Sequence, residues 1–344
     1  MKTLIIYLRK NLMRWLPGVL ISIVALGAIL FLIEFQEQDA KIDFSVIRPE
    51  AMVAAVLLTI LSLISKSMLW RTLLDNKPTL GQTFLIVNEG YLLNNLLPLK
   101  AGELGRAVFM GKATGLGTLH VLSTIVIERA FDVAVAAGMF LATFPLILGV
   151  EDANKTLALV SLAAVILVFV LLFLMARYHE QVKKIVEGWG QKSPLVAKFV
   201  VPKLDGLLRG LGVLTDARQF LLAIFWLVVT WSIWVSIYYI VLLSLVPDAP
   251  LWWGAFVDSF LALGAAVPSA PAGLGVYEAS LVGALSFLGI SVSVGLSYAL
   301  AMHLMQFLVT GTFGLVGLIK EGRSFASLFE ALQQREQDVP LAED

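Results

Sequence analysis

The sequence predicts an all-α polytopic membrane protein with six to eight transmembrane helices. Hydrophobic residues make up 59% of the 344 residues, charged residues make up 15%, and the mean hydropathy is +0.88. These values lie well outside the composition of soluble domains. Residues 17–33, 156–176 and 220–246 are uncharged runs, each about long enough to cross a hydrocarbon core that needs roughly 20 helical residues. The runs are continuous rather than alternating, which favours helices over a β-barrel.

The composition also argues against several functions. Lys+Arg and Asp+Glu are equal at 25 each, so nucleic acid is not an expected partner. Cysteine is absent and the three histidines lack a metal-ligand spacing, so we expect no disulfide, no metal and no cofactor. No GxSxG, Walker or HExxH motif is present, so we expect a transporter rather than an enzyme. An intramembrane hydrolase that uses Glu or Asp is a minor alternative.

Loop charges orient the first two spans. Lys2, Arg9, Lys10 and Arg14 precede the first run, and no small-residue cleavage site follows it, so we expect an uncleaved span with a cytoplasmic N-terminus. The acidic segment 34–50 then lies outside. A second span over about 51–70 returns the chain to the cytoplasmic side, where Lys66 near its inner end is expected to reach the interface.

The segment "NNLLPLKAGELGR", residues 94–106, interrupts the next apolar run. A full span over 79–97 would place Lys100, Arg106 and Lys112 outside. Eight Lys or Arg residues in 177–218 mark that stretch as cytoplasmic, and the two spans before it, about 118–150 and 156–176, place residues 99–117 on the same side. We therefore predict that residues 80–112 form a re-entrant hairpin entered from the cytoplasm.

The second half repeats this order with the opposite orientation. A span over 220–246 leads outward, a span over 297–319 leads back, and the C-terminal tail 321–344 is cytoplasmic. Residues 251–290 between them form a second hairpin, broken at "PSAPAGLGVYEA", residues 268–279.

These elements predict a single integral membrane domain in the cell (inner) membrane. It is built as an inverted repeat of 51–150 against 219–320, joined by a cytoplasmic amphipathic linker, 177–218. The alternatives are ordinary kinked spans, eight or so in all, and a merely solvated linker.

Charged and polar residues at membrane depth are the candidate functional residues, because such positions are unfavourable without a role or a partner. The candidate substrate-binding residues are Asn94, Asn95, Pro98, Lys100, Gly102, Glu103, Arg106, Glu128, Arg129, Asp132, Asp258, Pro268, Ser269, Pro271, Gly273, Gly275, Glu278 and His303. Helical spacing places Glu103 with Arg106, and Glu128 with Asp132, on shared faces.

The broken helices predict an anion site. Backbone N–H groups at a helix start bind groups such as phosphate, and Gly102, Gly273 and Gly275 permit close approach of the backbone to a ligand. Arg106 and Arg129 are suited to clamp a phosphate, whereas Lys100 acts as a point charge or only marks the cytoplasmic interface. A self-neutralising salt-bridge network is the alternative for the charged residues near 128–132.

Three segments together, "NNLLPLKAGELGRA", "IERAFDV" at 127–133 and "PSAPAGLGVYEA", resemble the transmembrane domain of lysylphosphatidylglycerol synthases, a flippase-like family with stand-alone members. The resemblance implies movement of a lipid between leaflets. That lipid is aminoacylated phosphatidylglycerol in the fused synthases, and a glycolipid or lipid-linked intermediate in other members. No aminoacyl-transferase domain is found here, so lysyl transfer is not expected.

The resemblance points to particular residues as well: Asn95, Pro98, Gly102, Glu103, Arg106, Glu128, Arg129, Asp132, Pro268, Pro271, Gly273, Gly275 and Glu278. The chain departs from the family at His303, near where relatives often carry an arginine, and at Ala270 and Ala272, so substrate identity does not carry over.

The expected function is a lipid flippase that moves a phosphate-bearing lipid or lipid-linked headgroup through a cavity between the two halves. The expected partners are membrane lipids, namely an anionic phospholipid or a lipid-linked sugar, together with a second copy of the chain or a lipid-modifying enzyme. Two alternatives remain. One is a non-transporting scaffold for a lipid- or envelope-modifying enzyme. The other is a small-solute or ion transporter with a closed, water-lined path.

Overall fold

The computed structural model describes residues 19–29, 31, 41–97, 100–149, 151–193, 212–267 and 269–322. Every regular element in these residues is helical, and none of them forms a β-strand. Five helices are long and apolar enough to cross a membrane: α2 (Pro49–Leu73), α5 (Thr118–Ile147), the Leu159–Arg177 part of α6 (Glu151–Arg177), α10 (Ala217–Leu242) and α13 (Val292–Lys320). The chain is therefore an all-α, multi-pass membrane protein, as the sequence predicts.

Local signals set where these helices begin. Pro49 occupies the first turn of α2, where its missing N–H is no loss. Thr79 accepts a hydrogen bond from the Gln82 N–H at the start of the next helix, and Asp216 accepts one from the Gln219 N–H at the start of α10. Such side-chain caps satisfy N–H groups that have no partner inside the helix.

Two helical hairpins occupy the positions where the sequence predicts breaks. The first consists of α3 (Leu80–Leu96) and α4 (Ala101–Thr114), and the second of α11 (Leu251–Ala265), the short 3₁₀ helix η3 (Pro271–Gly273) and α12 (Val276–Phe287). The four α-helical arms have 17, 14, 15 and 12 residues, fewer than the roughly 20 that a membrane span needs. Neither hairpin consists of two full spans.

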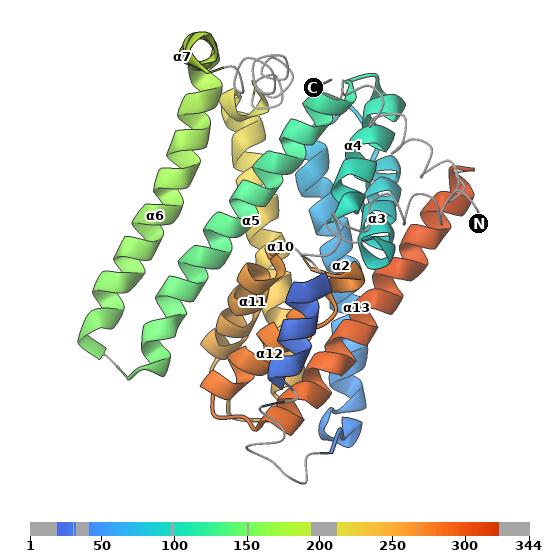
Figure 1. Cartoon of the computed structure of the whole chain (residues 1–344), viewed down its shortest axis with the longest axis vertical. Coiled ribbons are helices and arrows are strands. Elements are labelled where there is room, and N and C mark those ends of the chain that lie inside the picture. The colour runs from blue at the N-terminus through green and yellow to red at the C-terminus, as the bar shows by residue number, and fades with distance from the viewer. Residues whose placement is uncertain are drawn as a thin grey trace.

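The hairpins enter the bundle from opposite ends. In Figure 1, α3 and α4 lie in the upper half and α11 and α12 in the lower half, with the two turns near mid-height. Each hairpin follows one long helix and precedes another, α2 and α5 in the first half and α10 and α13 in the second. The path of the hairpins relative to a bilayer stays a prediction.

Long helices from both halves hold the bundle together. Helix α10 packs along α2, α13 along α3, and α11 along α5. Buried side chains form two apolar clusters, one that includes Trp70 and Phe131 and one that includes Phe256 and Tyr298. Helix α6 packs on α5 at the edge of the bundle (Figure 1), and most of its outer apolar side chains are exposed. An exposed apolar face of this kind is expected of a helix that contacts lipid.

The first predicted span, 17–33, is described only in part. An apolar helix covers Val19–Ile29, and the remainder of the predicted span, except residue 31, lies outside the described residues. This helix packs on the turn of the second hairpin, where the Ser22 hydroxyl accepts a hydrogen bond from the Ala270 N–H at 2.9 Å. Gly275 lies against the Ser22 carbonyl, and a Cβ added at Gly275 would come within 2.6 Å of that oxygen.

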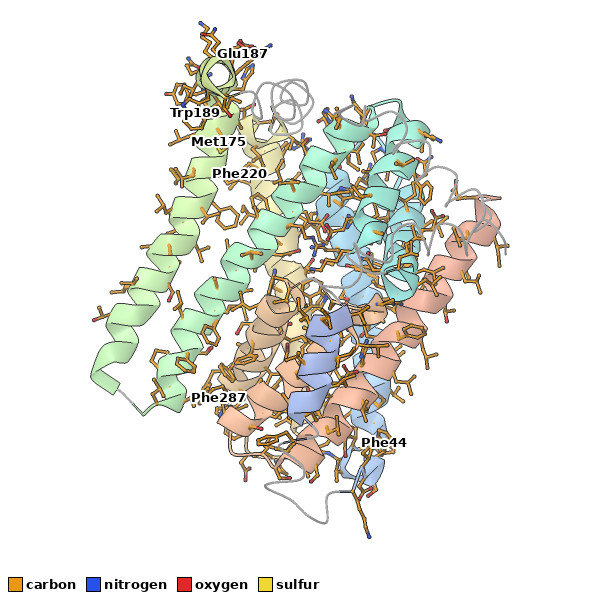
Figure 2. All side chains as sticks on the ribbon, viewed as in Figure 1. Phe44, Met175, Glu187, Trp189, Phe220 and Phe287 are labelled. Carbon is orange, nitrogen blue, oxygen red and sulfur yellow. The ribbon has the colours of Figure 1, made fainter. Side chains whose placement is uncertain are left out.

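The described part of the predicted amphipathic linker is helix α7 (His179–Lys192), which crosses the upper end of the bundle and is seen end-on in Figure 1. Val182 and Val186 pack on the nearer apolar cluster, while Ile185 and Trp189 are more than half exposed. Figure 2 shows Glu187 and Trp189 at this end, opposite Phe44 and Phe287. Three further segments lie outside the described residues: 32–40 after the first helix, 194–211 of the linker and 323–344 of the predicted tail.

The α3–α4 contact yields the first prediction. A Cβ at Gly102 would collide with the Gly90 carbonyl of the facing helix and come within 2.6 Å of Asn94 Oδ1. Gly102→Ala is therefore expected to push the two arms apart and to destabilise the protein by about 1–3 kcal/mol. The apparent Tm of the detergent-solubilised protein measures the effect. Gly81→Ala on α3 is the matched control, because a Cβ there meets nothing within 4 Å. Equal Tm values for the two variants would contradict the close contact.

Candidate functional site

A network of buried charges lies between α2, α4 and α5. Its centre is Glu128 on α5, whose side chain is 0% exposed. The Glu128 carboxylate accepts hydrogen bonds from Arg106 Nη2 at 2.9 Å and Arg129 Nη2 at 2.8 Å, and it lies 3.1 Å from Lys66 Nζ. Three cations on three helices thus surround one fully buried carboxylate. Such pairing is needed because a buried charge without a partner is strongly unfavourable.

Two further carboxylates complete the network. Lys66 Nζ donates to both oxygens of Asp132, at 2.8 and 3.1 Å. Arg129 is 3.4 Å from Asp132 through Nη1 and 3.4 Å from Glu103 through Nε. We call this set the charge network; its members are Lys66, Glu103, Arg106, Glu128, Arg129 and Asp132. With three cations and three carboxylates, the charge network has no net charge, as the salt-bridge alternative predicts.

The guanidinium of Arg106 is bound within the charge network. Both terminal nitrogens of its guanidinium face Glu128, at 2.9 and 3.4 Å. The guanidinium also lies 4.1 Å above the Trp70 ring, a cation–π contact. The predicted bidentate clamp therefore holds a carboxylate of the protein itself. Arg129 differs, because its side chain remains 35% exposed.

The sequence-based expectation for Lys66 is wrong. We expected its ammonium group to reach the interface, but the side chain is 1% exposed and is bound to Glu128 and Asp132. Without Lys66 the buried carboxylates would outnumber the cations of the charge network, which an apolar bundle disfavours. A signal was present in the sequence: Lys66 follows Ser62 by four residues, which marks a polar stripe on an otherwise apolar helix.

Two adjoining cavities of about 200 and 300 Å³ lie between the two hairpin turns. They share a wall and we treat them as one, the central cavity. The residues that line both parts are Tyr91, Asn95, Lys100, Arg129, Ala265, Ala272 and Tyr277. Residues of both halves of the chain therefore form the wall, as expected of a site between two related halves.

The central cavity gathers many of the predicted residues. Those that line it are Asn94, Asn95, Lys100, Glu103, Arg106, Arg129, Asp132, Asp258, Ser269, Gly273 and His303. Predicted residues that do not line it are Gly102, Glu128, Pro271, Gly275 and Glu278. Pro98 and Pro268 lie outside the described residues. Several aromatic residues of the wall were missed, namely Tyr91, Trp231, Trp234, Tyr238 and Tyr277. Aromatic residues in apolar helices are too common to stand out.

Lys100 is a cation near the charge network that does not belong to it. It forms the turn between α3 and α4, in the left-handed conformation with φ 55°. Its side chain lines both parts of the central cavity, and it makes no ion pair within the described residues. Lys100 therefore has access to the central cavity, and its position relative to a membrane interface stays a prediction. The charge network and Lys100 together carry one net positive charge.

At each predicted anion site, one backbone N–H group is already bonded within the chain, and anion binding there stays a prediction. The Gly102 N–H donates to Asn94 Oδ1 at 2.8 Å, and the Gly275 N–H donates to Glu278 Oε2 at 2.7 Å. Each hairpin thus caps the helix after its own break. Gly102 and Gly275 allow close packing against other backbone, while Gly273 is the predicted glycine that lines the central cavity.

His303 and Glu278 form a second buried polar group at the second break. His303 Nδ1 lies 2.6 Å from Glu278 Oε1, and His303 Nε2 lies 3.0 Å from the Ala272 carbonyl oxygen. The Tyr277 ring stacks on the imidazole with centroids 4.2 Å apart. Asp258 lines the central cavity nearby, is 3% exposed and makes no hydrogen bond through Oδ2 to any described residue.

Comparison with known proteins decides the family. The family model for the lysylphosphatidylglycerol synthase TM region matches residues 15–314. The chain belongs to this family. The match spans all three segments on which the resemblance rests, and it relates this membrane protein to lipid handling. Searches of curated proteins and of solved structures gave no significant match.

The charge network yields the second prediction. Lys66→Met removes one of three cations and leaves Asp132 with Arg129 alone, at 3.4 Å, so it is expected to destabilise the protein by about 3–5 kcal/mol. The double variant Lys66→Met/Asp132→Asn restores the balance of charge and should recover much of the loss. Thermal unfolding in detergent measures both variants. Lys77→Met, at an exposed lysine, is the control, with an expected change within about 0.5 kcal/mol. A double variant no more stable than Lys66→Met would contradict the pairing.

Proposed function

We propose that the protein moves a lipid with an anionic, phosphate-bearing headgroup between the leaflets of the membrane, through the central cavity. One observation carries the proposal. A cavity formed by both hairpin turns has in its wall a lysine that forms no ion pair with a carboxylate of the described residues. An uncompensated cation in apolar surroundings is unfavourable, and one anionic group supplied by a ligand would neutralise it.

The headgroup phosphate would contact Lys100 and the exposed side of Arg129. These two cations line both parts of the central cavity, and they come from adjacent elements, the α3–α4 turn and α5. Arg129 keeps its bonds to Glu128 and Asp132 while part of its guanidinium faces the cavity. A phosphate therefore adds to the site without breaking the charge network.

The other wall suits the uncharged part of a headgroup. Asn95, Ser269 and Tyr277 offer hydrogen-bonding groups, and Asp258 on α11 is placed to accept a hydrogen bond. Glycerol or sugar hydroxyl groups are donors of the kind that Asp258 lacks among the described residues. The cavity therefore has a cationic side and a hydrogen-bonding side.

Apolar residues at the rim favour a lipid over a small solute. Val133 and Phe307 line the central cavity, and their side chains are 48% and 38% exposed on the bundle surface. A lipid can thus keep its tails outside while its headgroup enters. A closed, water-lined path, expected of a small-solute transporter, does not need large apolar residues that face both cavity and surface.

We further propose that both hairpins are re-entrant and form an inverted repeat in the membrane. The arms are too short to span, and the hairpins enter from opposite ends (Figure 1). Such an arrangement is typical of transporters that expose a central site to each side in turn. The charge pattern of the loops supports the same topology.

Reconstitution into phosphatidylcholine vesicles tests the proposal and is the third prediction. The protein is expected to move a fluorescent phosphatidylglycerol between leaflets much faster than empty vesicles do. A prenyl-phosphate sugar is the second probe, and a fluorescent diacylglycerol without phosphate is the negative probe. Lys100→Met is expected to slow the anionic lipids on the order of tenfold, because a charged hydrogen bond contributes about 1.5–3 kcal/mol.

Lys112→Met is the matched control for Lys100→Met. Lys112 lies on the same helical hairpin, is exposed and does not line the central cavity. Its substitution is expected to leave the rate within twofold of the wild type. The proposal is refuted by vesicles in which neither anionic probe moves faster than without protein.

A further inference from the structure

The hydrogen bonds of His303 determine how many protons the Glu278–His303 pair holds. The Ala272 carbonyl oxygen only accepts, so His303 Nε2 must carry a hydrogen to bond it at 3.0 Å. The 2.6 Å contact between His303 Nδ1 and Glu278 Oε1 needs a second hydrogen, on one atom or the other. The pair therefore binds one proton more than a neutral histidine with a carboxylate, and its net charge is zero.

Loss of that proton changes both the charge and the bonding of the second break. The pair would then carry one negative charge. In one of the two contacts of the imidazole, a ring nitrogen without a hydrogen would face an oxygen lone pair, so that contact would no longer be a hydrogen bond. Ala272 is held at φ 60°, a left-handed conformation that alanine rarely adopts. His303 fixes this residue to α13 through the Ala272 carbonyl. Protonation of the pair is thus coupled to the geometry of the turn that lines the cavity.

Charge balance links this proton to the anionic ligand. The charge network is neutral and Lys100 adds one positive charge. Asp258, whose buried Oδ2 has no hydrogen-bond partner among the described residues, is counted as the neutral acid. Two states of the cavity are then neutral overall. One has neither ligand nor proton, and the other has both a singly charged anion and the proton. States with only one of the two carry a charge of +1 or −1, which apolar surroundings disfavour.

We propose that the Glu278–His303 pair is the coupling site of a proton symporter, in which one proton crosses with each anionic headgroup. This inference rests on the proposed function. The proton enters from water on one side and leaves to water on the other, and only an N–H or O–H bond is made and broken. His303 lines the central cavity, so the proton and the headgroup use the same space.

Other titratable groups face the pair from the neighbouring elements. Tyr277 stacks on the imidazole from α12, and others line the same part of the central cavity as His303: Lys66, Lys100, Arg129, Asp132, Tyr238 and Asp258. Lys66, Arg129 and Asp132 are bound within the charge network. Tyr91 approaches from α3, whereas Glu89 of that helix packs at Gly317, 14 residues along α13 from His303. Asp258 is therefore the main rival as a proton carrier.

Glu278→Gln is the variant that tests the coupling, and its effect is the fourth prediction. A glutamine accepts from the Gly275 N–H and donates to His303 Nδ1, so it keeps the bonds of the protonated pair. It cannot exchange the proton. In vesicles that contain fluorescent phosphatidylglycerol, acid outside should speed inward movement by the wild type, by up to about tenfold per pH unit. For Glu278→Gln the ratio of rates with and without the gradient should be close to one.

Two controls assign the effect. Glu50→Gln makes the same change at an exposed residue of α2 that lines neither part of the central cavity and does not belong to the charge network, so its ratio should match the wild type. Asp258→Asn tests the rival carrier. The proposal is overturned when the wild type moves lipid at a ratio of one, when Glu278→Gln keeps the wild-type ratio, or when Asp258→Asn alone abolishes the response. In the first of these cases the proposed function still stands.

Lipid binding gives a second readout that does not depend on transport. The affinity of the detergent-solubilised wild type for phosphatidylglycerol, measured by native mass spectrometry between pH 5.5 and 8.5, should fall by up to about tenfold per pH unit above the titration of the pair. Glu278→Gln should show a flat profile. Equal slopes for the two proteins overturn the proton site. Failure to bind or move either anionic lipid overturns the proposed function, and the proton coupling with it.

Discussion

Helices that stop halfway through an apolar bundle leave backbone N–H groups that no solvent can satisfy, and the rest of the structure depends on how these groups are bonded. The protein solves the problem within each hairpin. Asn94 of the first hairpin accepts from Gly102, and Glu278 of the second accepts from Gly275. A third donor, the Ala270 N–H, is bonded by Ser22 of the first helix. Because the breaks are capped, the chain can turn at mid-height and leave a cavity there.

The two caps differ in chemistry, and this difference separates the two sides of the cavity. The amide of Asn94 is neutral and does not titrate, so the cap of the first break carries no charge. The cap of the second break is a carboxyl group that is bound to a histidine on another helix. Lys100 lies at the first break, which has the amide cap, and His303 lies at the second break, which has the carboxyl cap. The central cavity lies between them. Under the proposed function, the charge of the ligand and the charge of the proton act within one small volume, where the weak screening of an apolar bundle makes single charges decisive.

Much of the fold was predictable because hydropathy and loop charge are properties of local segments. The five long helices follow from apolar segments and the charges of the loops between them, and the short hairpin arms follow from the positions of Lys100, Arg106 and Lys112 relative to the basic linker. Residues of both motif segments line one cavity, namely Asn94, Asn95, Lys100, Glu103, Arg106, Ser269 and Gly273. Local pattern does not reveal pairing across the bundle, however. Lys66 meets Asp132, 66 residues away, and His303 meets Glu278, 25 residues away.

The roles of individual residues were harder to predict for the same reason. Gly102 and Gly275 read as places where a ligand could approach, but in each case another stretch of backbone fills that space. Arg106 read as a phosphate ligand, but a carboxylate of α5 takes its terminal nitrogens. A sequence shows which polar and charged groups in apolar segments need a bonding partner. Only the packing shows whether another part of the protein can provide it.

Helix α13 contacts both breaks. His303 bonds the turn of the second hairpin, and Thr310, seven residues further on, accepts a hydrogen bond from Asn95 of the first. Seven residues of α-helix are about two turns, or roughly 10 Å. One short segment of α13 therefore contacts two turns that belong to opposite halves of the chain. Any rotation or axial shift of α13 changes both contacts together. Helix α13 therefore links the two hairpin turns mechanically, in addition to the cavity that both turns line.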